Sequence, residues 1–154
     1  MFRSGVPRNR SAVFFSPARF LYDQLRQRLY LSGTAQVDLF DLSSLSFSAP
    51  ITFFPGGPPP NAGLRGLMLT PDNSQLIVAD FGGQSIYLAD PNQPATPGTK
   101  VAVGGLAGFS SSGPARVTAT NASTVFVGLS GEGGSSGVCS GCLGQLNMTT
   151  TTLV

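Results

Sequence analysis

The sequence has no histidine, and among its 154 residues it has only one lysine, Lys100, and one glutamate, Glu132. Histidine is the most common general acid or base in catalysis, so proton transfer would fall to six aspartates, Glu132 and three tyrosines. No serine stands in a G-x-S-x-G motif, and no glycine-rich phosphate loop leads from a strand into a helix. We therefore expect no catalytic and no cofactor-binding residue in this chain.

Charge is scarce, and turn-forming residues are abundant. Charged residues make up 10% of the chain, against roughly 25% in an average soluble domain. The chain has 20 glycines and 12 prolines, and 41% of its residues are hydrophobic. Glycine and proline favour turns and disfavour helix interiors. The composition therefore predicts an all-β fold of many short strands.

The net charge of +2 is too small to indicate a nucleic-acid partner. Six of the eight arginines lie in the first 28 residues, which predicts a basic, solvated arm over residues 1–17; contact with an anionic surface is the alternative.

No apolar run approaches the roughly 20 residues of a membrane-spanning helix. The apolar run 12–15 is too short for a signal peptide. The compartment stays open: either cytoplasmic, or extracytoplasmic with the true N-terminus upstream.

Three apolar triplets mark an internal repeat. Leu29–Leu31 is followed 47 residues later by Leu76–Val78 and 49 residues after that by Val125–Val127. A strand-rich repeat with a period in the 40s is typical of a β-propeller blade. In the middle copy we expect four strands, at 64–69, 75–79, 85–89 and 99–103.

The repeat predicts blades of four antiparallel strands at about 18–54, 64–104 and 114–154. The third copy ends at "TTTTLV", where its fourth strand should begin. A propeller has about 4–8 blades, so three copies form an incomplete ring. We expect either a fragment of a longer protein, whose remaining blades complete the ring, or self-association of several chains.

The stretch "LTPDNSQLIVADFGGQSIYLAD" (69–90) resembles the YVTN-type β-propeller repeat. Its matching residues are Pro71, Asp72, Leu76, Val78, Ala79, Ile86 and Asp90. The first copy matches through Asp23, Leu29, Tyr30, Leu31, Val37 and Asp41. The departures are Asn73, where glycine is usual, and Asp80, where asparagine is usual. The resemblance implies a bacterial or archaeal extracytoplasmic binding scaffold, with lactonase-like enzymes as a minority.

Cys139 and Cys142 lie in a Gly/Ser-rich hairpin. A disulfide that staples this loop is one interpretation, and it would fit an oxidising compartment; free thiols or a redox pair are the alternatives. A structural zinc site needs four Cys or His ligands. The chain has two cysteines and no histidine, so we expect no metal site.

An arginine recurs near the start of each copy: Arg19, Arg65 and Arg116. The first strands of propeller blades line the central channel, so these arginines would form a ring that attracts anions. Alternatively, each bonds backbone or a carboxylate and holds neighbouring blades together. The third strands end at Asp41, Asp90 and Asn147, where short polar side chains are expected to bond the following turn.

The sequence favours a non-catalytic β-propeller scaffold that binds a protein or a carbohydrate through the loops 55–63 and 130–144. The alternative is part of a lactonase-like or other hydrolytic propeller whose site lies mostly outside this chain. A third reading is that the isolated chain folds poorly and has no function of its own.

Overall fold

The computed structural model describes residues 19–102, 112–121, 123–131, 142–147, 150 and 152–153, and every regular element in these ranges is a β-strand. The strands form three antiparallel sheets that follow one another along the chain. The first sheet contains β1 (Arg19–Asp23), β2 (Arg28–Ser32), β3 (Gln36–Asp41), β4 (Ser46–Phe47) and β5 (Ile51–Thr52). The middle sheet contains β6 (Leu64–Leu69), β7 (Leu76–Asp80), β8 (Ser85–Ala89) and β9 (Thr99–Ala102). The third sheet contains β10 (Ser112–Asn121), β11 (Thr124–Gly131), β12 (Cys142–Asn147) and β13 (Thr152–Leu153). The all-β prediction is confirmed.

The apolar triplets of the repeat all lie on the second strand of their sheet, β2, β7 or β11. Two short strands differ from expectation. In the first sheet, β4 was not predicted, and both β4 and β5 pair with β3. In the third sheet, β13 already pairs with β12, through Leu146 opposite Leu153 and Asn147 opposite Thr152. The last copy therefore includes the start of its fourth strand.

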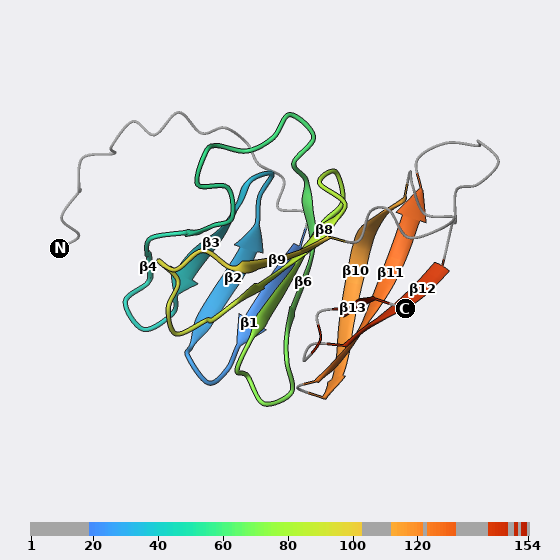
Figure 1. Cartoon of the computed structure of the whole chain (residues 1–154). Coiled ribbons are helices and arrows are strands. Elements are labelled where there is room, and N and C mark those ends of the chain that lie inside the picture. Colours follow the sequence, from blue (N-terminus) through green and yellow to red (C-terminus); the bar gives the residue numbers. More distant parts are fainter. Residues whose placement is uncertain are drawn as a thin grey trace, which may run out of the picture.

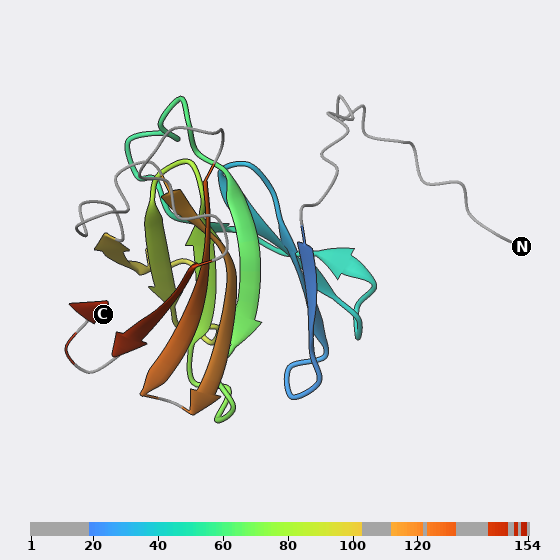
Figure 2. The same cartoon turned by 90° about the vertical axis from the view of Figure 1, so that its right-hand side faces the viewer.

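The middle sheet is packed on both faces. It lies between the other two sheets in Figure 1, and in Figure 2 the third sheet lies in front of it and the first sheet beside it. One core cluster joins it to the first sheet: Tyr30, Val37, Leu39, Ile51, Phe53, Leu64, Leu69, Leu76, Val78, Tyr87 and Ala89. A second cluster joins it to the third sheet: Ile77, Ile86, Val101, Val125, Val127, Leu129 and Leu146. Side chains alternate between the two faces of a strand. Leu76 and Val78 of β7 therefore pack in the first cluster, and Ile77 packs in the second. This explains why β7 is an unbroken apolar run up to Asp80.

The turns contain four non-glycine residues with positive φ: Gln27 (50°), Leu45 (51°), Asn73 (57°) and Gln84 (47°). Asn73 takes the position where the repeat usually has glycine, and asparagine tolerates this conformation. Gly82 and Gly83 lie in the β7–β8 hairpin, where glycine has a different role.

Gly82 and Gly83 are needed for space. A Cβ on Gly82 would lie 1.4 Å from the carbonyl oxygen of Asn61, and a Cβ on Gly83 would lie 2.0 Å from Oδ2 of Asp80. Neither glycine has a φ in the left-handed region. In this hairpin the residue with a left-handed φ is Gln84. Glycine is required here because backbone and a buried carboxylate approach the hairpin closely.

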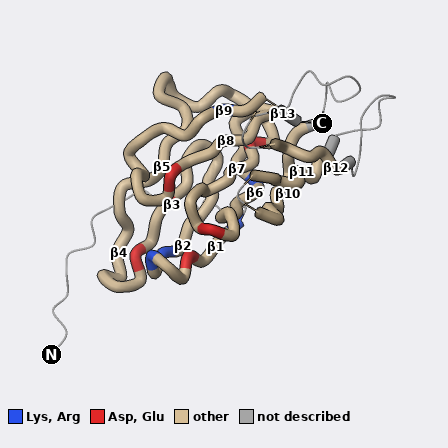
Figure 3. Tube along the Cα trace, turned by 60° about the horizontal axis from the view of Figure 1, so that its bottom comes forward, with Lys and Arg blue, Asp and Glu red and all other residues tan. Residues whose placement is uncertain are grey.

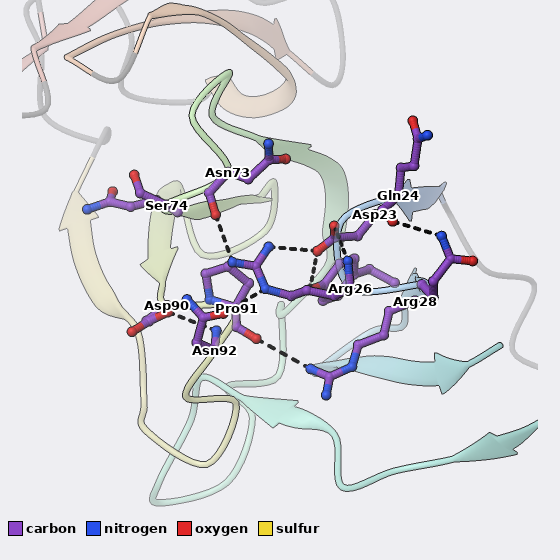
Figure 4. Close-up of polar contacts among 12 residues, drawn as sticks. Asp23, Gln24, Arg26, Arg28, Asn73, Ser74, Asp90, Pro91 and Asn92 are labelled. Carbon is purple, nitrogen blue, oxygen red and sulfur yellow. Dashed lines mark hydrogen bonds and ion pairs between the residues drawn. The ribbon is translucent and has the colours of Figure 1, made fainter. Parts of the chain in front are cut away.

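Arg26 links the first and middle sheets in the β1–β2 hairpin (Figure 4). Its guanidinium donates hydrogen bonds to Asp23 Oδ2 at 2.9 Å, to Asn92 Oδ1 at 2.8 Å and to the carbonyl of Asn73 at 3.0 Å. Asp23, 1% exposed, also accepts a bond from the Tyr30 hydroxyl at 3.1 Å. We call Asp23, Arg26 and Tyr30 the Arg26 cluster. It ties a buried carboxylate to two turns of the next sheet.

The Arg26 cluster belongs to a first sheet that also contains two other N-terminal arginines. Arg19 and Arg28 lie on β1 and β2, and Arg26 lies in the hairpin between them. The arm expected over residues 1–17, with the other three arginines, lies outside the described residues. Arg28 also reaches the middle sheet, with Nη1 3.5 Å from the Pro91 carbonyl.

One sequence interpretation is corrected at Asp23, which the resemblance matched to the turn aspartate of the repeat. Asp23 directly follows the residue paired with Leu29, and Thr70 directly follows the residue paired with Leu76, so Asp23 corresponds to Thr70. Both are 1% exposed, and both accept a backbone N–H from the turn that follows. Asp72, by contrast, is exposed and bonds Ser74.

Candidate functional site

The first strands of the three sheets lie side by side, because β6 contacts both β1 and β10. Gly66 permits the approach of β10. A Cβ at this position would lie 3.0 Å from the Cβ of Ala79 and 3.3 Å from the carbonyl oxygen of Ala115. A larger residue would push the two strands apart. The inner surface of the molecule is therefore formed by β1, β6 and β10.

A hollow of about 190 Å³ opens between these three strands, and we call it the inner-strand hollow. It is lined by Arg19 of β1, Gly66 and Leu67 of β6, and Ala115, Arg116 and Val117 of β10. Arg19 and Arg116 are both exposed. In the described residues, neither arginine forms an ion pair with a carboxylate. Among the described residues, the lining of this hollow therefore has two positive charges and no acidic residue.

Arg65 lies in a second hollow, of about 450 Å³, which we call the Phe81 hollow. Its guanidinium carbon lies 3.8 Å from the centroid of the Phe81 ring. Asn61, Gly63, Gln84 and Gly113 also line this hollow. The structure thus brings Arg19 and Arg116 to one hollow and places Arg65 in another.

One wall of the Phe81 hollow is held by Asp80, whose side chain is fully buried. Its Oδ1 accepts hydrogen bonds from the backbone N–H groups of Gly63 and Gly83, both at 3.0 Å. The N–H of Phe81 donates to the carbonyl of Gly63 at 2.9 Å. These bonds fix the loop before β6 against the β7–β8 hairpin. A Cβ on Gly113 would lie 2.1 Å from the Phe81 carbonyl oxygen, so β10 packs directly on this wall.

Charged residues are few in the described chain, and several lie near the turns of the first sheet (Figure 3). The prediction that Asp41, Asp90 and Asn147 bond the following turns is confirmed: they accept backbone N–H groups at 2.8–3.2 Å. The hydrogen bond from the Ser43 hydroxyl is the main cause that lowers the pKa of Asp41 to about 2. Asp41 is therefore ionised at neutral pH, and its carboxylate accepts the backbone N–H groups of the turn that follows β3.

The cysteine prediction falls mostly outside the described residues, which include neither Cys139 nor the side chain of Cys142; the backbone of Cys142 begins β12. Over the ranges given above, no group of three or more His, Cys, Asp or Glu side chains could hold a metal ion. The same ranges contain no helix long and apolar enough to cross a membrane.

The sequence analysis did not single out Phe81 and missed its contact with Arg65. No local pattern indicates this contact, because the two residues come from separate parts of the middle blade. The approach of Gly113 and Asn61 also depends on tertiary packing and left no local signal.

No family model matches the sequence, and no curated protein matches it. Several solved structures do match it. The match to hydrazine synthase from Kuenenia stuttgartiensis covers 98% of this chain and 38% of the hydrazine synthase chain, with a TM-score of 0.65 and 14% sequence identity. The β-propeller domain of Cps50 (Swd1) from Myceliophteria thermophila matches 88% of this chain, with a TM-score of 0.59 and 11% identity. The three sheets are blades of a β-propeller. A GH74 enzyme from Niastella koreensis also matches, over 88% of this chain, with a TM-score of 0.59 and 19% identity.

This chain spans 20–38% of the length of the three propeller chains it matches. At these identities the similarity shows the fold alone. The blades form an incomplete propeller, and β1, β6 and β10 are its inner strands.

Proposed function

We propose that this β-propeller segment is a non-catalytic binding scaffold of the YVTN type, and that its inner-strand hollow receives an anionic group of a protein or carbohydrate ligand. The observation that carries the proposal is the pair Arg19 and Arg116, which come from different blades and line one hollow. Two guanidinium groups without an acidic neighbour attract a group with two negative charges, such as a sulfate or a phosphate.

The hollow is large enough for one anionic group of a ligand but too small for a complete small molecule. Sites for complete small molecules are about 300–1,000 Å³, and this hollow has about 190 Å³. The loops 55–63 and 130–144 stay the predicted contact regions for the rest of the ligand, and residues 132–141 of the second loop lie outside the described residues. An extracytoplasmic bacterial location, which the resemblance implies, fits the same proposal. A disulfide between Cys139 and Cys142 would fit such an oxidising compartment.

The test is a titration of the ¹⁵N-labelled chain with inorganic phosphate, followed by amide chemical shifts. We expect shifts at Gly66, Leu67 and Val117, and affinity about tenfold weaker or more in Arg116→Ala. Lys100→Ala is the matched control, because it removes one exposed positive charge from β9. Equal weakening in both variants would mean that only net charge matters, and it would overturn the proposal.

We further propose that the open face of the first blade is covered by another blade, which a second copy supplies in the isolated chain. This face leaves Phe20, Tyr22 and Phe47 exposed at 74%, 46% and 59%. The opposite face of the same blade packs on the middle blade, and blades pack face to face. We expect light scattering to show oligomers for the natural chain and monomers for Phe20→Asp. A monomeric natural chain would contradict this proposal.

A further inference from the structure

Three asparagines of the chain begin the triplet Asn-x-Ser/Thr: Asn9, Asn121 and Asn147. When its middle residue is not proline, this triplet is the acceptor for N-linked glycans, which lie on surface loops. Of the three asparagines, Asn121 alone lies in the described part of the chain together with its hydroxyl residue, Ser123. We propose that Asn121 is an N-glycosylation site, and that its glycan covers the end of the propeller opposite the loop 55–63.

Asn121 and Ser123 lie at the turn between β10 and β11, and their side chains bond each other. The Oδ1 of Asn121 accepts the backbone N–H of Ser123 at 2.9 Å and the Ser123 hydroxyl at 2.8 Å. This arrangement is an Asx turn, and it holds the hydroxyl against the side-chain amide. The two N–H groups of that amide take part in neither bond, because both bonds use the oxygen. The atom that a glycan modifies, Nδ2, is therefore not engaged by this turn.

The modification is a group transfer from a glycosyl group activated as a diphosphate ester, and a separate transferase carries it out. A base of that enzyme removes one proton from Nδ2 of Asn121. The nitrogen electron pair then forms a bond to C1 of the sugar, and the bond from C1 to the diphosphate oxygen breaks. The diphosphate leaves with that electron pair, so the step needs neither an oxidant nor a reductant. Ser123 is a positioning residue, because its hydroxyl orients the amide that reacts.

The turn that contains Asn121 is accessible. Asn121 and Ser123 are both exposed. Asn121 pairs with Thr124, and Thr124 pairs with Asn147, so these residues lie across one end of the third sheet. The triplet that begins at Asn147 is therefore at the same end. A glycan on this turn lies beyond the strands and leaves both faces of the blade free to pack on neighbouring blades.

This end of the molecule is remote from the proposed ligand contacts. The β10–β11 turn lies at the same end as the β1–β2 and β6–β7 turns, and the loop 55–63 lies at the opposite end (Figures 1 and 2). Asn121 follows Arg116 of the inner-strand hollow by five residues on β10, which is roughly 15 Å along an extended strand. A glycan here leaves the hollow open and makes a chain with only 10% charged residues more soluble.

The experiment is glycopeptide mass spectrometry on the full chain purified from its natural host, for the natural sequence and for variants expressed there. Digestion with trypsin and chymotrypsin cleaves after Arg116 and Phe126, which separates Asn121 from Asn147. We expect the peptide that contains Asn121 to have the added mass of a glycan. Ser123→Ala should lose this mass completely, whereas Ser123→Thr, which restores the hydroxyl, should keep it.

Thr124→Ala is the matched control, because it removes the next hydroxyl along the chain, which is outside the triplet, and should leave the glycan in place. Unmodified Asn121 in the natural protein would overturn the proposal. So would a glycan mass that persists in Ser123→Ala. Ser123 is exposed, so its replacement should preserve the fold, and an unchanged circular dichroism spectrum verifies this. None of these results depends on phosphate binding at the inner-strand hollow, so either proposal can fail alone.

Discussion

Replacing Asp23 by alanine is expected to lower the free energy of unfolding by about 3–5 kcal/mol, the usual cost of removing one partner from a buried ion pair. The side chain of Asp23 is fully buried, and that of its partner Arg26 is 12% exposed. The substitution removes the carboxylate that accepts one of the three guanidinium hydrogen bonds and the bond from the Tyr30 hydroxyl. Urea denaturation measures the change.

Asp23→Asn is the matched variant, because it keeps the shape and a hydrogen-bond acceptor but removes the charge. Its loss of stability should be clearly smaller than that of Asp23→Ala. If both variants unfold at the same urea concentration as the natural protein, the Arg26 cluster does not stabilise the contact between the first two blades.

The same cluster predicts a dependence on pH. Burial alone would raise the pKa of Asp23, but the hydrogen bonds from Arg26 and Tyr30 outweigh it and hold the pKa below its ordinary value of 3.8. A lowered pKa in the folded state stabilises the protein above the unfolded pKa. This stabilisation is lost as the pH falls below about 4 and through the folded pKa. The stability difference between the natural protein and Asp23→Asn should therefore shrink over that interval.

Leu76→Ala and Ile77→Ala are expected to destabilise the protein by similar amounts, about 2–5 kcal/mol each, but at different interfaces. Both side chains are fully buried, Leu76 in the cluster shared with the first blade and Ile77 in the cluster shared with the third. The first cluster contains Tyr30 and Tyr87, and the described residues of the second cluster include no aromatic side chain, so near-ultraviolet circular dichroism separates the two.

We expect Leu76→Ala to change the tyrosine signal and Ile77→Ala to leave it nearly unchanged. The two variants serve as controls for each other, since they are neighbours on β7 and lose side chains of similar size. The same change of tyrosine signal in both would contradict the assignment of alternate residues to two separate cores.

Much of the fold could be predicted from the sequence, because a repeat fixes the position of equivalent strands. In the middle blade the expected 64–69 and 85–89 are the observed β6 and β8, and β7 begins one residue later than expected. The apolar triplets and the turn sequence around Asn73 carry this information locally, through strand propensity and turn chemistry.

The contacts between blades could not be predicted in the same way. Arg26 bonds Asn73 and Asn92, residues 47 and 66 positions away, and no local pattern indicates such a pair. The two hollows also arise from packing, since Arg19 and Arg116 meet only because Gly66 lets β10 approach β6. The recurrence of an arginine near the start of each copy suggested three equivalent arginines, whereas Arg65 lies over Phe81 in a separate hollow.

Amide hydrogen exchange of the natural chain, resolved strand by strand, tests most directly whether the molecule is a stack of three blades with the second buried between the others. Every residue of β7 is buried, so its amides should exchange most slowly, and those of β1, with Phe20 on an open face, markedly faster. Exchange from β7 as fast as from β1 would contradict the stacked arrangement.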